Sequence, residues 1–159
     1  MTVDLKKMEE DLTKEFTSYR KEKDEYMEGL NVIMRNVSDL ANRKHEIYRE
    51  RHRLVSKKFS LMNRVAELSK LHKEQEREII RAIKMGRKIV GFEDSDLVPK
   101  NDFERKAFME NFLKELEMCQ DLLNNYLTFV TDTIETIDRM LYGVGYVIQL
   151  ESMKSHIME

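Results

Sequence analysis

The longest regular pattern of apolar residues lies in the last third of the chain. Apolar side chains recur there at alternating steps of four and three residues, with Thr133 as the polar exception. This spacing is typical of heptad-repeat helices that pack knobs into holes. The stripe comprises Phe112, Leu116, Cys119, Leu123, Tyr126, Val130, Thr133, Ile137, Met140, Val144 and Val147. Gly143 and Gly145 interrupt it and predict a bend, followed by a short helix at 146–158.

Two more amphipathic helices are predicted upstream. Residues 4–28 place apolar side chains three and four positions apart, and Asp4 stands where an N-cap is expected. A second helix begins near residue 33, where one apolar residue recurs every seven positions: Ile33, Leu40, Ile47, Leu54, Leu61 and Leu68. The other positions of this seam are Val37, Lys44, Arg51, Lys58 and Val65. The pattern predicts a long helix whose seam is apolar on one edge and cationic on the other.

These patterns predict an all-α fold of long amphipathic helices with a C-terminal heptad-repeat helix. One proline and five glycines in 159 residues argue against sandwiches, barrels and doubly wound sheets. We expect a single helical domain over 1–159. Its N-terminal helices, with a basic stripe, occupy 1–88, a loop occupies 89–100, and the C-terminal oligomerisation helices occupy 101–159.

Long helices with long apolar stripes usually bury them against a partner subunit. We therefore predict a homo-oligomer assembled mainly through residues 112–147. The expected interface residues are Phe112, Leu116, Leu123, Tyr126, Val130, Ile137 and Met140. The alternative is an intramolecular arrangement in which the long helices of one chain cover each other.

Charge is segregated along the chain, although the net charge is only −2. Residues 1–42 hold 7 basic and 10 acidic residues, residues 43–88 hold 15 and 6, and residues 89–159 hold 6 and 14. The corresponding net charges are −3, +9 and −8. This asymmetry indicates either a polyanionic partner or pairing between the basic and acidic segments of the protein itself.

Motifs for catalysis are missing from the sequence. His45-Glu46 begins a zinc-protease pattern, but Arg49 stands at the position of the second histidine. We expect no enzymatic activity, no cofactor and no metal. The lone Cys119 suggests a reducing compartment, and the uncharged stretch 140–150 is too short to cross a bilayer. With a charged N-terminus unlike a signal peptide, a cytoplasmic protein is expected.

Residues 43–64 are the candidate binding surface, because eight basic residues stand there against Glu46 and Glu50. Lys44, Arg51 and Lys58 follow one line of the helix at intervals of roughly 10.5 Å. The predicted site contains these three cations with Arg53, Lys57, Arg64, Tyr48 and Phe59. Cations that pair with phosphates, beside rings that stack on bases, are typical of single-strand binding. A core role for Phe59 and a plain surface role for Tyr48 are the alternatives.

Two blocks of residues carry a resemblance to a known family. The first comprises Tyr26, Asn31, Met34, Ser38, Leu40, Asn42, Lys44, His45, Ile47 and Glu50. The second comprises Tyr126, Asp138, Gly145, Tyr146, Ile148, Met153 and Lys154. With these blocks the chain resembles the UvsY-like recombination mediator family of T-even bacteriophages. The family's basic site is a Lys-Lys pair followed by Lys-x-Arg-Leu. Lys57-Lys58 and Arg64 match it, whereas Met62 and Val65 depart from it.

The resemblance implies a protein that binds single-stranded DNA as a ring-like homo-oligomer of roughly six or seven subunits. It also implies that the protein helps to load a recombinase onto strands coated by single-strand binding protein, in the cytoplasm of an infected host cell. The C-terminal segment would drive self-association. A coiled-coil scaffold or adaptor without nucleic-acid binding is the competing hypothesis.

Overall fold

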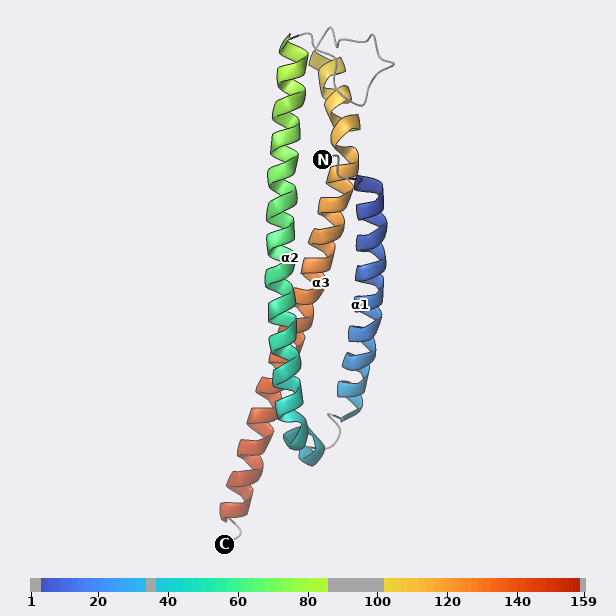
Figure 1. Ribbon diagram of the computed structural model, residues 1–159. Helices are drawn as coiled ribbons and strands as arrows, with labels where there is room; N and C mark the ends of the chain where they lie inside the picture. The colour runs from blue at the N-terminus through green and yellow to red at the C-terminus, as the bar shows by residue number, and fades with distance from the viewer. Residues whose placement is uncertain (1–3, 34–36, 86–101, 158–159) are drawn as a thin grey trace. The chain divides into compact units, whose positions relative to one another are not determined.

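The computed structural model describes residues 4–33, 37–85 and 102–157, apart from the side chains of 32–33, 37–42, 102, 108, 112, 151 and 154–157. Three helices account for this part of the chain: α1 (Leu5–Ile33), α2 (Val37–Met85) and α3 (Asp102–Ile157) (Figure 1). Asp4 is the one described residue outside them. The predicted all-α class is therefore confirmed. The predicted loop at 89–100 lies outside the described residues.

The start of α1 has the predicted cap. Asp4 Oδ1 accepts a hydrogen bond from the Lys7 backbone N–H at 3.1 Å, and the Asp4 carbonyl accepts one from the Met8 N–H at 3.0 Å. The first bond satisfies one of the backbone donors that a helix N-terminus leaves without an intrahelical partner, and the second is the first i to i−4 bond of the helix.

The predicted bend in the last helix is wrong. Helix α3 continues without interruption through Gly143 and Gly145 to Ile157, so no separate helix begins at residue 146. A Cβ atom at either glycine would have no atom within 4 Å. No close approach of another segment thus explains these glycines in the part of the chain that the structure describes.

The contacts within the chain divide it into two units. Unit 1 comprises Met1–Thr13 and Asn63–Asn124, and unit 2 comprises Lys14–Met62 and Asn125–Glu159. Each unit contains a piece of all three helices. The prediction that residues 1–159 form a single domain stays a prediction.

Unit 2 is a three-helix bundle in which α1 and α3 run in one direction and α2 in the other (Figure 1). The Phe16 ring of α1 stacks on the Tyr126 ring of α3, with 4.7 Å between centroids. Tyr19 and Phe129 complete this aromatic cluster. The buried apolar side chains of the unit are Leu30, Ile47, Leu54, Leu61, Tyr126, Val130, Ile134, Ile137, Leu141 and Val144.

Unit 1 packs the first turns of α1 and the second half of α2 against the first half of α3. Gln120 Nε2 donates a hydrogen bond to Ser69 Oγ at 3.3 Å, and the Cys119 thiol donates to the Leu5 carbonyl at 3.7 Å. Burial raises the pKa of the Cys119 thiol, with Glu9 and Glu115 adding to the effect. The buried apolar side chains are Leu12, Leu68, Ile79, Leu113, Leu116, Cys119 and Leu123.

The C-terminal stripe lies in the interior of the single chain. Five of the predicted interface residues are at most 1% exposed: Leu116, Leu123, Tyr126, Val130 and Ile137. Met140 is partly exposed, and the Phe112 side chain lies outside the described residues. The stripe is thus buried by its own chain, as in the intramolecular alternative. Its assignment to a subunit interface stays a prediction, and that interface would require copies to exchange helices.

Candidate nucleic-acid interface

The predicted basic stripe on α2 divides into cations that face solvent and cations bound to other helices. Its residues 43–62 belong to unit 2. Arg64 belongs to unit 1, where it is partly exposed.

Arg51 is bound to α3. Its Nε and Nη2 atoms donate to the two carboxylate oxygens of Asp138, and the Nη2–Oδ2 distance is 3.0 Å. Such a two-pronged contact matches the planar guanidinium to the planar carboxylate. The hydrogen bond from Arg51 lowers the pKa of Asp138. Arg51 therefore joins α2 to α3 and does not present an open guanidinium to solvent.

Lys57 is bound to α1. Its Nζ lies 2.7 Å from Glu15 Oε1 and 5.4 and 5.0 Å from the ring centroids of Tyr19 and Tyr126. The ammonium thus lies against two ring faces and a carboxylate, which is a favourable site for a cation. Burial raises the pKa of Tyr19 to about 12, against the opposing effect of Lys23. Lys57 therefore stabilises the aromatic cluster of unit 2.

The remaining basic side chains lie toward the outside. Arg43, Arg49 and Lys58 form no ion pair with any described residue, and Arg43 and Arg49 are exposed. Lys44 Nζ lies 5.9 Å from the ring centroid of Tyr48, which is 42% exposed. Phe59, next to Lys58 in the sequence, is 61% exposed. The core alternative for Phe59 is thus wrong.

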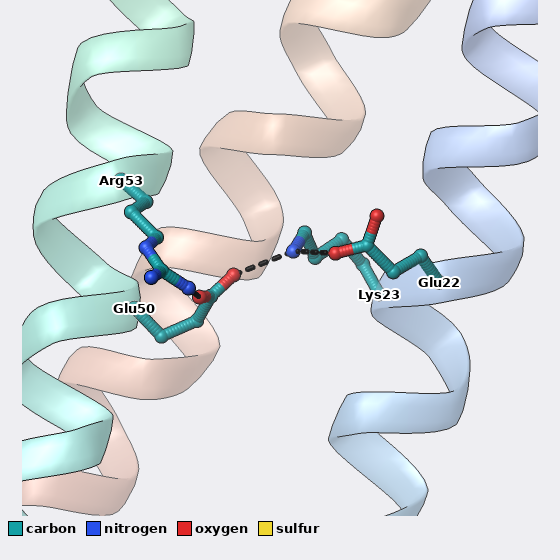
Figure 2. A network of polar contacts seen from close by, with 4 residues as sticks. All are labelled: Glu22, Lys23, Glu50 and Arg53. Atoms are coloured by element: carbon teal, nitrogen blue, oxygen red, sulfur yellow. Dashed lines mark hydrogen bonds and ion pairs between the residues drawn. The ribbon is translucent and has the colours of Figure 1, made fainter.

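A buried ion network removes one of the two acidic residues from this surface (Figure 2). Lys23 Nζ of α1 lies 2.6 Å from Oε1 of Glu50 on α2 and 2.6 Å from Oε1 of Glu22. The other oxygen of Glu50 accepts a hydrogen bond from the exposed Arg53 at 3.4 Å. Because Glu50 points toward α1, Glu46 is the one acidic side chain between residues 43 and 62 that is exposed.

The pKa of Lys23 reflects two opposing effects in this network. Burial lowers it, while the hydrogen bonds to Glu22 and Glu50 raise it, and the net shift is upward. Lys23 is therefore a charged group that is held inside the bundle by its carboxylate partners.

A groove between α2 and α3 in unit 2 lies beside the stripe. Its volume is about 620 Å³, and it contains two aromatic residues of α3 that the sequence reasoning missed. These are Tyr142 and Tyr146, which are 83% and 60% exposed. The lining comprises Lys44, Tyr48, Arg51, Asp138, Leu141, Tyr142, Gly145, Tyr146 and Gln149.

One signal in the sequence points to these tyrosines. They stand four residues apart and outside the a/d stripe, so both lie on a helix face that the stripe does not bury. The pattern leaves them exposed, but it does not reveal that Lys44 and Tyr48 of α2 lie across the groove from them.

Comparisons of the chain with models of protein families, with curated proteins and with solved structures find no match. The described helices contain no group of three side chains suited to hold a metal ion. None of these helices has an apolar segment of the length that crossing a membrane requires. The fold and the site thus define an all-helical protein with exposed basic and aromatic side chains on α2.

Proposed function

We propose that this protein binds single-stranded DNA through the outer face of α2 in unit 2. As a recombination mediator without catalytic activity, it would help to load a recombinase onto strands coated by single-strand binding protein. The observation that carries the DNA-binding proposal is the exposure of two rings on the basic helix α2: Tyr48, which lies near the Lys44 ammonium, and Phe59.

The chemistry of an unpaired strand fits this surface. Phosphates require cations that are not already neutralised, and unstacked bases require exposed ring faces. Arg43, Lys44, Arg49 and Lys58 supply the charge, against Glu46 alone. Arg53 is also exposed, but it is bonded to Glu50. A duplex offers its phosphates but keeps its bases stacked, so the exposed rings favour the single strand.

The predicted site residues take two roles in this proposal. Lys44, Arg53 and Lys58 contact phosphates, and Tyr48 and Phe59 stack on bases. Arg51 and Lys57 hold the helices together through Asp138 and Glu15. Arg64 belongs to unit 1, where it is partly exposed, and its contact with a phosphate stays a prediction.

The mediator role and the ring-shaped homo-oligomer are supported by the resemblance described above. In an oligomer, one strand would contact several copies of the α2 surface, and each added contact is intramolecular. The gain in apparent affinity would allow the protein to compete with a single-strand binding protein.

The test is a salt titration of binding. A labelled dT oligonucleotide is titrated with the wild type and with the triple variant Arg43→Ala/Arg49→Ala/Lys58→Ala, followed by fluorescence anisotropy. The slope of log K against log salt should become less steep by about 2, at roughly 0.7 per lost phosphate contact. The control variant Lys14→Ala/Lys21→Ala/Lys106→Ala removes the same number of positive charges from exposed positions outside α2 and should keep the wild-type slope. Equal slopes for all three proteins would refute the assignment.

A scaffold without nucleic-acid binding is the second candidate. The pairs Arg51–Asp138 and Lys57–Glu15 favour it, because part of the basic block neutralises acidic residues of the same chain. The same titration separates the two candidates. Absence of binding at micromolar protein and low salt would support the scaffold.

A further inference from the structure

We infer that the groove between α2 and α3 of unit 2 is a binding site for an unpaired nucleobase and its phosphate. The inference rests on the proposed function and adds to it a second element, α3, and a position where one base is held. Three tyrosines enter the lining, Tyr48 from α2 and Tyr142 and Tyr146 from α3.

Two rings of the lining are exposed to solvent. Tyr142 is 83% exposed and Tyr146 is 60% exposed, although they neighbour the buried Leu141 and Val144. Rings that stay in water while adjoining apolar residues are buried are available to stack on a planar ligand. A groove of about 620 Å³ has room for a nucleotide.

The charge of the groove selects the class of ligand. Lys44 and Arg51 bring two positive charges and Asp138 brings one negative charge, so the lining is cationic. Tyrosine cages also bind quaternary ammonium groups, but a cationic lining disfavours such a ligand. It favours an aromatic group that carries a negative charge, which describes a nucleotide.

The polar groups of the groove fit the two parts of a nucleotide. Arg51 is occupied by Asp138, so Lys44 is the cation left to contact a phosphate. The amide of Gln149 both donates and accepts hydrogen bonds, as the edges of bases do. Arg51 and Asp138 are positioning residues, because their contact holds α2 and α3 on the two sides of the groove.

The test compares strands with and without bases. Anisotropy titrations of the full chain use a labelled dT oligonucleotide and an abasic phosphodiester strand of the same length and label. The double variant Tyr142→Ala/Tyr146→Ala should bind the dT strand roughly tenfold more weakly. It should bind the abasic strand as the wild type does. Tyr142→Phe/Tyr146→Phe should restore dT binding, because stacking needs the ring and not the hydroxyl.

Two controls make the result specific. Phe103→Ala removes another exposed ring of α3, 82% exposed and in unit 1, and should leave both affinities unchanged. Circular dichroism and thermal melting should match the wild type for every variant, since the altered rings are exposed and alanine favours helix.

The outcomes separate the two proposals. If Tyr142→Ala/Tyr146→Ala binds the dT strand as tightly as the wild type does, the groove proposal is wrong and the α2 surface proposal is unaffected. A wild-type protein that binds neither strand would overturn both. Equal losses on the dT and abasic strands would also overturn the groove, because they would reflect lost charge contacts or folding and not stacking.

Discussion

Lys23 of α1 and Glu50 of α2 form an ion pair inside unit 2, with 2.6 Å between Nζ and Oε1 and side chains only 7% and 8% exposed (Figure 2). Burying two charges is costly, and the cost is offset only when both partners and their remaining hydrogen bonds are in place. Glu22 and Arg53 provide those further contacts. The pair therefore favours the one alignment of α1 and α2 in which Lys23 meets Glu50.

Lys23→Ala should lower the free energy of unfolding by about 3 kcal/mol, because it leaves a buried carboxylate without its main partner. The double variant Lys23→Met/Glu50→Leu, which removes both charges and keeps their volume, should recover most of this loss. Urea unfolding followed by circular dichroism measures both. A loss no greater than that of Lys21→Ala, an exposed neighbour, would contradict this account.

Asp138 predicts a pH dependence of stability. Arg51 lowers its pKa in the folded protein, so its contribution is fully present above the unfolded pKa of about 4 and is lost as the pH falls through the folded value. Both side chains are partly exposed, so the contribution should be no more than about 1 kcal/mol. Asp138→Asn should therefore destabilise the protein at pH 7 and make little difference near pH 2, as measured by urea unfolding at each pH. A difference that grows toward low pH would be the opposite of this expectation.

Gly143→Ala should raise the free energy of unfolding by about 1 kcal/mol, because the residue lies within α3 and its added methyl group meets no atom within 4 Å. Gly29→Ala, equally open and inside α1, should behave alike. Thermal melting of the two variants gives the measurement. If Gly143→Ala destabilises the protein and Gly29→Ala does not, another molecule approaches this part of α3.

Ile137→Ala tests where the C-terminal stripe is used. The side chain is fully buried within unit 2, so its truncation should cost about 2–5 kcal/mol of folding free energy. Thermal melting and light scattering at one subunit concentration should show a lower melting temperature and an unchanged mass below it. A variant that melts like the wild type but has a lower mass would instead place Ile137 in an interface between subunits.

The core and the site differ in how far the sequence could predict them. Ile47, Leu54, Leu61 and Leu68 recur every seven residues, and all are buried in the structure. The bend predicted at Gly143 and Gly145 is absent, because a glycine weakens a helix by only about 1 kcal/mol and the long packed helix α3 tolerates it. Local periodicity thus identified buried positions well and helix interruptions poorly.

The sequence by itself determined that this protein is helical and that its basic residues gather on one helix, because both depend on neighbours three, four and seven positions apart. Only the tertiary structure decided which of these basic side chains are bound to acidic residues of other helices. Arg51 meets Asp138 across 87 positions and Lys57 meets Glu15 across 42. Contacts at such separations depend on how the helices pack and leave no local pattern. The same packing placed Tyr142 and Tyr146 beside Lys44 and Tyr48, and so formed the groove.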